Sequence, residues 1–274
     1  LPAAGRVGLA GYLAGYGFVE IDPEARQKRE AFLREATPAA DRMLAHIRKG
    51  GWGAISAIHG VLGKLDIEKA PESLPYTLPA AQFGKQAAAV SRIFDAASGA
   101  PGIEPVRDAA GRCTGVVLHS VAAAGFLGGV WMEAVVHRRT ESLLDSACET
   151  HLAAGLVLGI DIPGTNLENA PVEDREYDLV LMIEDQPHIV EVKASQNPGK
   201  IGRDLSSLVR KRETIAGQQC RAWLLAPILK PSLLDAGDIV RRARSQGVSI
   251  YAGQGALDRY EADIRHILGR TGRP

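Results

Sequence analysis

The spacing of apolar side chains changes character about halfway along the chain. Before Gly125 the sequence is rich in Ala and Gly, and helical spacing is predicted only at Pro23–Arg48 and Ala80–Ala97. Between these two stretches glycines recur and prolines follow, a composition typical of loops. The pattern therefore predicts a mainly helical first segment with no internal repeat.

After Gly125 helices and strands can be assigned one after another, because runs of helical spacing alternate with short β-branched and aliphatic runs. The predicted order is α-β-β-β-α-β-α-β-α, which indicates an α/β domain with a mixed sheet flanked by helices. The predicted elements are a helix at 126–153, a strand at 155–162, a hairpin with strands at 177–183 and 188–194 joined by a turn at 184–187, a helix at 202–216, a strand at 221–226, a helix at 233–245, a strand at 248–252 and a helix at 256–268.

The chain is long enough for two domains. Its 274 residues exceed the usual span of one compact unit. Gly, Pro and Asp cluster at Ser98–Gly111, just before a short apolar run at Thr114–Val121. We therefore expect a mainly helical segment at residues 1–110 and a second domain at residues 111–274.

Composition narrows the classes of function. Acidic and basic side chains balance at 32 each, so any contact with nucleic acid must come from local basic patches. No apolar run approaches the roughly 18 residues of a membrane span, and we expect no membrane partner. Cys113, Cys148 and Cys220 lie far apart without paired spacing, which favours a reducing, cytoplasmic setting over a disulfide framework or zinc ribbon. The motifs of zinc hydrolases and Walker-type ATPases are absent.

Two carboxylates and one ammonium fall on the predicted hairpin. Asp178 begins one strand and Glu191 lies in the next, 191 − 178 = 13 positions later, a gap that two short strands and a tight turn fill. Side chains alternate along a strand, so Glu191 and Lys193 emerge on one face and Val192 on the other. Paired carboxylates repel unless a cation neutralises them, and oxygen ligands favour Mg²⁺ or Mn²⁺. The alternative is an ordinary surface strand with an ion-paired Glu and Lys, because Glu-x-Lys is a very common tripeptide.

A third acid lies on the predicted helix upstream. Glu133 interrupts an apolar run from Phe126 to Val136. A carboxylate in such surroundings is costly unless it is paired or binds a metal. An exposed position on the outer face of the helix is the alternative that the spacing leaves open.

Three short motifs follow one another in this half of the chain. They are Gly-x-Trp-(apolar)-Glu at 129–133, Glu-x-Asp at 176–178 and Glu-x-Lys at 191–193. In this order they resemble the PD-(D/E)xK nuclease superfamily and, more narrowly, the nuclease domains linked to CARF sensor domains in CRISPR antiviral defence, which cyclic oligoadenylates activate. The resemblance covers about Gly125–Gly269. It implies a restriction-endonuclease-like core (αβββαβ) and metal-dependent hydrolysis of phosphodiester bonds in DNA and/or RNA.

The resemblance also implies a role for each matched residue. The implied catalytic residues are Glu133, Asp178, Glu191 and Lys193. Asp178 and Glu191 would bind the metal with the backbone carbonyl of Val192, and Glu133 would complete the acidic cluster directly or through water. Glu176 shares a strand face with Asp178, so it is either an additional acid of the site or a solvated residue at the strand entrance.

Basic residues near the predicted sheet edge are candidates for contacts with nucleic-acid phosphates, or else form an ordinary solvated helix face. These residues are Lys200, Arg203, Arg210, Lys211 and Arg212. The resemblance also implies a homodimer. It implies cyclic oligoadenylate as a partner only if a CARF domain lies upstream of this chain, because the first hundred residues are too short and too helical for that sensor.

Two further interpretations stay open at this point. Residues 1–110 match the place of the helical, winged-helix-like insert or linker domain of CARF-linked proteins. The chain is alternatively a catalytically inactive nucleic-acid-binding or scaffolding module with a nuclease-like fold, or a restriction or repair endonuclease outside CRISPR defence.

Overall fold

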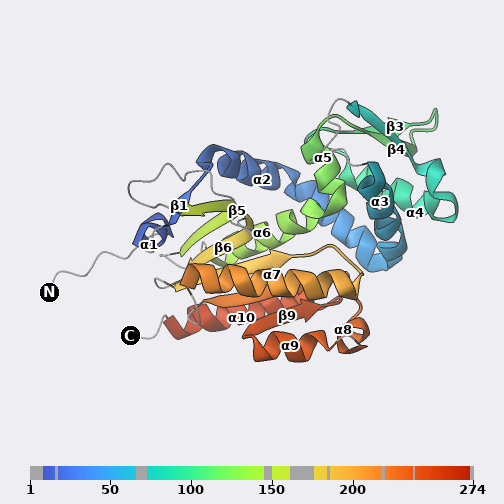
Figure 1. Ribbon diagram of the computed structural model, residues 1–274. Helices are drawn as coiled ribbons and strands as arrows, with labels where there is room; N and C mark the ends of the chain where they lie inside the picture. Colours follow the sequence, from blue (N-terminus) through green and yellow to red (C-terminus); the bar gives the residue numbers. More distant parts are fainter. Residues whose placement is uncertain are drawn as a thin grey trace. The chain divides into compact units, whose positions relative to one another are not determined.

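A computed structural model describes residues 9–15, 18–65, 73–144, 150–160, 176–183, 186–216, 220–236 and 238–271 (Figure 1). The chain separates into two compact units. The first unit comprises Leu1–Glu30, Arg139–Lys193 and Asn197–Pro274, and the second comprises Ala31–Arg138 and Ala194–Gln196. The boundary predicted between residues 110 and 111 falls in the loop between two strands of the second unit, so the structure divides the chain elsewhere.

The first unit is built on a six-stranded mixed sheet in the order β1-β5-β6-β7-β8-β9. Neighbours from β1 to β7 run antiparallel, and β7, β8 and β9 run parallel. The strands are β1 (Phe18–Glu20), β5 (Thr150–Ile160), β6 (Glu176–Ile183), β7 (Gln186–Val192), β8 (Arg221–Ala226) and β9 (Val248–Ala252). The helices are α1 (Leu9–Gly15), α7 (Pro198–Ala216), α8 (Ser232–Ala236), α9 (Ile239–Ser245) and α10 (Ala256–Thr271), while α2 (Pro23–His46) and α6 (Trp131–Leu144) belong to both units.

The element order α6-β5-β6-β7-α7-β8 matches the predicted αβββαβ core. The predicted fold class, an α/β protein with a mixed sheet and a mainly helical N-terminal segment, is confirmed. Strands β6 and β7 are buried along nearly their whole length because helices cover both faces of the sheet. Leu205 of α7 packs in the core on one face, and the ring of Tyr260 in α10 meets Trp223 edge-on at 5.8 Å on the other. Among the described residues, no helix is long and apolar enough to cross a membrane.

Three predicted boundaries in the first unit are wrong. The predicted helix at 126–153 ends at Leu144 in α6, and β5 already begins at Thr150. The predicted helix at 233–245 is two helices, separated at Asp238, whose backbone is left-handed with φ 55°. Strand β7 begins at Gln186, inside the predicted turn, and residues 184–185 of that turn lie outside the described residues.

His188 is a buried polar side chain in the centre of β7. It is 1% exposed, and its ring lies 5.4 Å from the ring of Trp223. Burial, with a smaller contribution from Arg221, lowers the pKa of His188 to about 4. The folded protein therefore keeps this imidazole neutral at a pH where an unfolded chain protonates it.

We expect the free energy of unfolding to fall by about 2 to 3 kcal/mol between pH 7 and pH 4.5 on account of His188. The unfolded chain binds a proton near pH 6.5 and the folded chain only near pH 4, so stability is lost as the pH falls through this interval. His188→Leu removes this contribution. Urea unfolding of both proteins at the two pH values measures it, and an equal pH dependence would contradict the assignment.

The second unit combines helices with a three-stranded antiparallel sheet in the order β2-β4-β3. Its elements are a π-helical turn (Ile47–Gly51), α3 (Trp52–Leu65), β2 (Tyr76–Pro79), a 3₁₀ helix (Ala80–Gln86), α4 (Ala87–Ala97), β3 (Ile103–Arg107), β4 (Cys113–Leu118), α5 (Val121–Gly125) and a π-helical turn (Phe126–Val130). Neither α3 nor the sheet was expected: α3 falls in the predicted glycine-rich loop, and β3 falls in the predicted boundary at 98–111.

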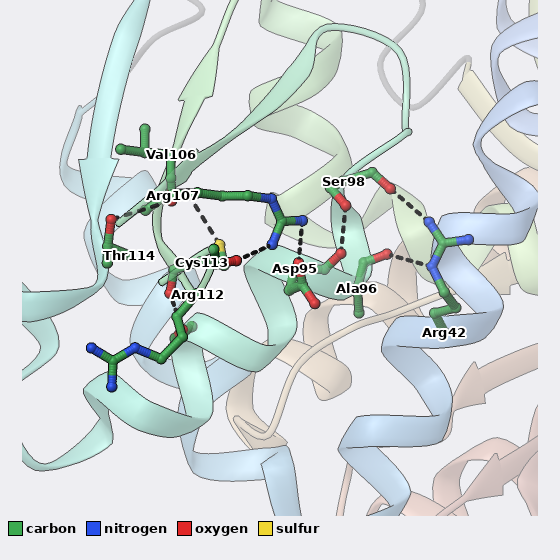
Figure 2. Close-up of polar contacts among 12 residues, drawn as sticks. Arg42, Asp95, Ala96, Ser98, Val106, Arg107, Arg112, Cys113 and Thr114 are labelled. Atoms are coloured by element: carbon green, nitrogen blue, oxygen red, sulfur yellow. Dashed lines mark hydrogen bonds and ion pairs between the residues drawn. The ribbon is translucent and has the colours of Figure 1, made fainter. Parts of the chain in front are cut away.

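Arginine side chains hold the end of α4 in place, as Figure 2 shows. Arg42 of α2 donates from Nε to the carbonyl of Ala96 at 3.2 Å and from Nη2 to the carbonyl of Ser98 at 2.6 Å. Arg107 of β3 donates to Asp95 Oδ1 at 2.6 Å. The last carbonyls of a helix lack intrahelical partners, so the two hydrogen bonds from Arg42 satisfy carbonyls at this end and link it to α2. The ion pair of Arg107 with Asp95 links α4 to β3.

Candidate active site

Asp178 and Glu191 lie opposite each other on the hairpin of β6 and β7. Leu179 of β6 pairs with Val190 of β7. Because the strands are antiparallel, the residue before Leu179, Asp178, faces the residue after Val190, Glu191. Both acids share a sheet face with residues two positions away that belong to the core beneath α7. The sequence prediction that these carboxylates are neighbours on one face agrees with this register.

The side chain of Asp178 also accepts a backbone hydrogen bond from β7. Its Oδ2 accepts a hydrogen bond from the N–H of Val192 at 2.7 Å. The next N–H, of Lys193, points to the other side and donates to the carbonyl of Leu225 in β8 at 2.8 Å. Because the N–H and C=O of one strand residue point to the same side, the Val192 carbonyl is directed to the side of Asp178.

Lys193 lies between the two acids. Its Nζ is 2.6 Å from Glu191 Oε1 and 3.7 Å from Asp178 Oδ2, and the exposed fractions are 22%, 5% and 14% for Lys193, Glu191 and Asp178. Burial acts to lower the pKa of Lys193, but the charges of Asp178 and Glu191 outweigh it and raise the pKa above its ordinary value. The two carboxylates therefore favour the charged ammonium form of Lys193.

A second ammonium, that of Lys211 in α7, also contacts Glu191. Its Nζ lies 2.8 Å from Glu191 Oε2 and 5.7 Å from the ring centre of Tyr177, and the side chain is 7% exposed. The prediction that Lys211 belongs to an exposed nucleic-acid surface is wrong, because its charge is buried against Glu191. No local pattern indicates this burial, since Lys211 stands in a basic tripeptide that is typical of a solvated helix face.

Asp204 is a further acid near this cluster that the sequence analysis did not identify. It lies in α7 seven residues, or about two turns, before Lys211, so both side chains project from one side of the helix. Its Oδ2 is buried without a hydrogen-bond partner. Burial raises the pKa of Asp204, while Lys193 and Lys200 act to lower it. The helical spacing of Asp204 and Lys211 is the sequence feature that could have revealed both.

The structure brings together three of the four predicted catalytic residues. Glu133, half-buried in the first turn of α6, belongs to the second unit, whereas Asp178, Glu191 and Lys193 belong to the first. Its membership of the cluster stays a prediction, as does that of Glu176, which is exposed at the start of β6. Among the described residues, no three His, Cys, Asp or Glu side chains lie close enough together to hold a metal ion.

The remaining predicted phosphate contacts differ in exposure. Lys200, Arg203 and Arg210 are exposed along α7. Arg212 is half-buried and lies beside Gly247. A Cβ added to Gly247, whose φ is +65°, would lie only 2.5 Å from Arg212 Nη1. Arg212 therefore packs against the turn before β9, and the three exposed residues are the ones accessible to a polyanion.

The fold itself is shared with known structures. No protein-family model and no curated protein sequence matches the chain. Among solved structures, protein VC1899 from Vibrio cholerae superposes with a TM-score of 0.59 at 16% identity over 97% of this chain. Can2 from Sulfobacillus thermosulfidooxidans, solved in complex with cyclic tetra-adenylate, superposes with a TM-score of 0.51 at 14% identity over 95% of this chain. The chain covers 61% of the length of each, and at these identities the likeness shows the fold alone.

Proposed function

We propose that this chain is a metal-dependent nuclease that hydrolyses phosphodiester bonds of DNA or RNA. Asp178 and Glu191 bind Mg²⁺ or Mn²⁺, and Lys193 is the catalytic lysine. The observation that carries the proposal is the grouping of these three side chains on one face of the β6–β7 hairpin, where Lys193 Nζ lies 2.6 Å from Glu191 Oε1 and 3.7 Å from Asp178 Oδ2.

The donor set suits a hard divalent cation. Two carboxylates share a face, the Val192 carbonyl is directed to the same side as Asp178, and the acids already hold one cationic group, the ammonium of Lys193, between them. Mg²⁺ commonly uses one or two carboxylates and keeps several waters, so two acids are sufficient. When bound, the ion supplies Lewis acidity at the scissile phosphate and lowers the pKa of a water molecule.

Lys193 supplies positive charge beside the phosphate that is cut. The partial burial of Lys193 strengthens the interaction of its ammonium with the charge that develops on a phosphate oxygen. Glu191, held from its other oxygen by Lys211, is oriented towards Lys193. These contacts fix the geometry of the acids before any substrate binds.

The biological setting that we propose is CRISPR-type antiviral defence, with the chain acting as a homodimer in the cytoplasm. The sequence resemblance implies this setting, and the shared fold with Can2, which was solved with cyclic tetra-adenylate, supports it. Glu176 is a further acid of the proposed site, and the sequence resemblance implies the same role for Glu133. Activation by cyclic oligoadenylate belongs to the proposal only for a protein in which a sensor domain accompanies this chain.

Binding of Mn²⁺ is expected to raise thermal stability, because an ion that binds only the folded state stabilises it by about 2.7 kcal/mol at 100 times its dissociation constant. Asp178→Asn should lose most of this gain, and EDTA should reverse it. The same protein is assayed for Mn²⁺-dependent cleavage of single- and double-stranded DNA and RNA. A parent chain that gains no stability from Mn²⁺ or Mg²⁺ and cuts none of these would rule out the proposal.

One observation favours a second candidate, a catalytically inactive nucleic-acid-binding module. Glu191 makes ion pairs with both Lys193 and Lys211, which satisfies the carboxylate without a metal. Such a module would bind oligonucleotides in EDTA and show neither stabilisation by Mn²⁺ nor cleavage. The metal titration therefore separates the two candidates.

A further inference from the structure

A pocket of about 600 Å³ lies in the first unit, apart from the acid–lysine cluster. It is formed by α7, α8 and α9, and its size is within the range of small-ligand sites. The residues that line it are Pro198, Gly199, Gly202, Arg203, Ser206, Arg210, Leu233, Ile239 and Arg242. Among the described residues that line it there are three arginines and no carboxylate.

Small residues on α7 create the space and position one of the arginines. Ser206 donates from Oγ to the carbonyl of Gly202 at 3.2 Å, and Arg242 of α9 donates from Nη2 to the same Ser206 oxygen at 3.2 Å. A Cβ on Gly202 would lie 3.8 Å from Arg242 Nη1, so this glycine leaves room beside the guanidinium. The guanidinium of Arg242 is thus held over the helix and beside the pocket.

The charges in the pocket suit an anion. Arg203, Arg210 and Arg242 expose three guanidinium groups at one pocket, and no carboxylate is among the described residues that line it. Arginine matches phosphate through paired N–H donors. Leu233 and Ile239 add an apolar wall that suits a sugar or base rather than a bare inorganic ion.

The pocket and the acid–lysine cluster lie on different sides of α7. Asp204 and Lys211 project towards the cluster, whereas the pocket residue Ser206 is rotated from Asp204 by about 200° around the helix. A helix with its side chains is about 10 to 12 Å across, so a strand that reaches both places must extend past α7.

We infer that this pocket binds a nucleotide of the nucleic-acid strand that is cut, with its phosphate on Arg203, Arg210 and Arg242 and its sugar or base against Leu233 and Ile239. The inference rests on the proposed nuclease function and specifies its substrate contact. The pocket sets the register of the strand without reading its sequence, because its polar contacts go to phosphate.

Binding is measured with the full chain in EDTA, so that cleavage does not interfere, using fluorescein-labelled single strands of DNA and RNA of about 12 nucleotides. Arg242→Ala and Arg203→Ala should each raise the dissociation constant about three- to tenfold and reduce the slope of log K against log salt by about one. Arg244→Ala is the matched control, because Arg244 is exposed on the same helix but does not line the pocket. It should change the dissociation constant less than about twofold.

A second variant distinguishes weaker binding from a loss of folded protein. Gly202→Glu places a carboxylate in the pocket and replaces a glycine inside a helix by a better helix former, so it should weaken binding at least as much as Arg242→Ala without loss of thermal stability. Adenosine monophosphate serves as the free-nucleotide probe. The inference is overturned if Arg242→Ala and Gly202→Glu bind both strands as the parent does. It is equally overturned if only the binding of adenosine monophosphate depends on the pocket.

Cleavage in Mn²⁺ is scored separately. A chain that never cuts, yet binds strands more weakly after Arg242→Ala, would retain the pocket inference for nucleic-acid binding and remove the nuclease proposal. A chain that cuts normally with every pocket variant at unchanged affinity would remove the pocket inference alone.

Discussion

Lys193→Ala is expected to slow phosphodiester cleavage by about 10²- to 10³-fold, the usual cost of removing one charged or hydrogen-bonding group from a transition state. At the same time the variant should bind Mn²⁺ more tightly than the parent. Lys193 Nζ lies 2.6 Å from Glu191 Oε1, so its removal leaves the two acids with less competing positive charge. Cleavage rates at saturating Mn²⁺ and metal titrations followed by thermal unfolding measure the two effects.

The opposite signs of these effects separate a catalytic lysine from one that only maintains the fold. Glu191→Gln is the comparison, because it should lose both cleavage and stabilisation by Mn²⁺. If Lys193→Ala cuts as fast as the parent, Lys193 has no catalytic role. If both variants lose metal binding together, Lys193 acts by holding the acids in place.

Lys211→Met is expected to lower the free energy of unfolding by about 2 to 3 kcal/mol. The variant leaves Glu191, which is 5% exposed, with only one of its two ammonium partners. Removing one member of a buried ion pair is costly because the remaining charge stays out of water. Urea unfolding at pH 7 measures the loss, with Lys200→Met, an exposed position on the same helix, as the matched control.

The double variant Lys211→Met with Glu191→Gln tests the reason for this loss. If the cost arises from an uncompensated carboxylate, neutralising Glu191 should recover a large part of it. If the loss of stability in the double variant equals the sum of the losses in Lys211→Met and Glu191→Gln, the two residues are not coupled. Lys211 would then stabilise α7 by packing against Tyr177.

The hairpin of β6 and β7 could be predicted because several sequence features agreed. Apolar β-branched runs, a turn-forming composition between them and the two-residue spacing of Glu191 and Lys193 all indicate the same local structure. The position of the acids on the strands then fixes which side chains face each other. Local pattern was sufficient here because the relevant partners are close in sequence.

Elsewhere tertiary contacts outweighed local preference. Residues 150–154 contain good helix formers, yet they form strand β5 because each pairs with a residue of β6, as Leu152 does with Leu181. In α3, Gly53, Gly60 and Gly63 suggested a loop. The helix forms nevertheless because Ala54, Ile55, Ile58 and Leu62 make one buried stripe, a gain that exceeds the cost of about 1 kcal/mol per glycine.

The candidate site shows a similar limit. Asp178, Glu191 and Lys193 were identified from motifs on two adjacent strands, but Lys211 and Asp204 come from the helix that packs over them. Their roles depend on the rotation of α7 about its axis, which is set by the burial of Leu205 and Leu208 in the core. Basic residues that look alike in the sequence therefore separate into one buried ion-pair partner and several exposed ones.

The pairing of β1 with β5 bears on how the protein folds during synthesis. Phe18 pairs with Ile160, so 160 − 18 = 142 residues are translated between the two, which takes on the order of 10 seconds at ribosomal rates. All but three residues of the second unit, Ala31–Arg138, lie within that interval. Nearly all of the second unit is therefore synthesised after β1 and before β5, the strand with which β1 pairs.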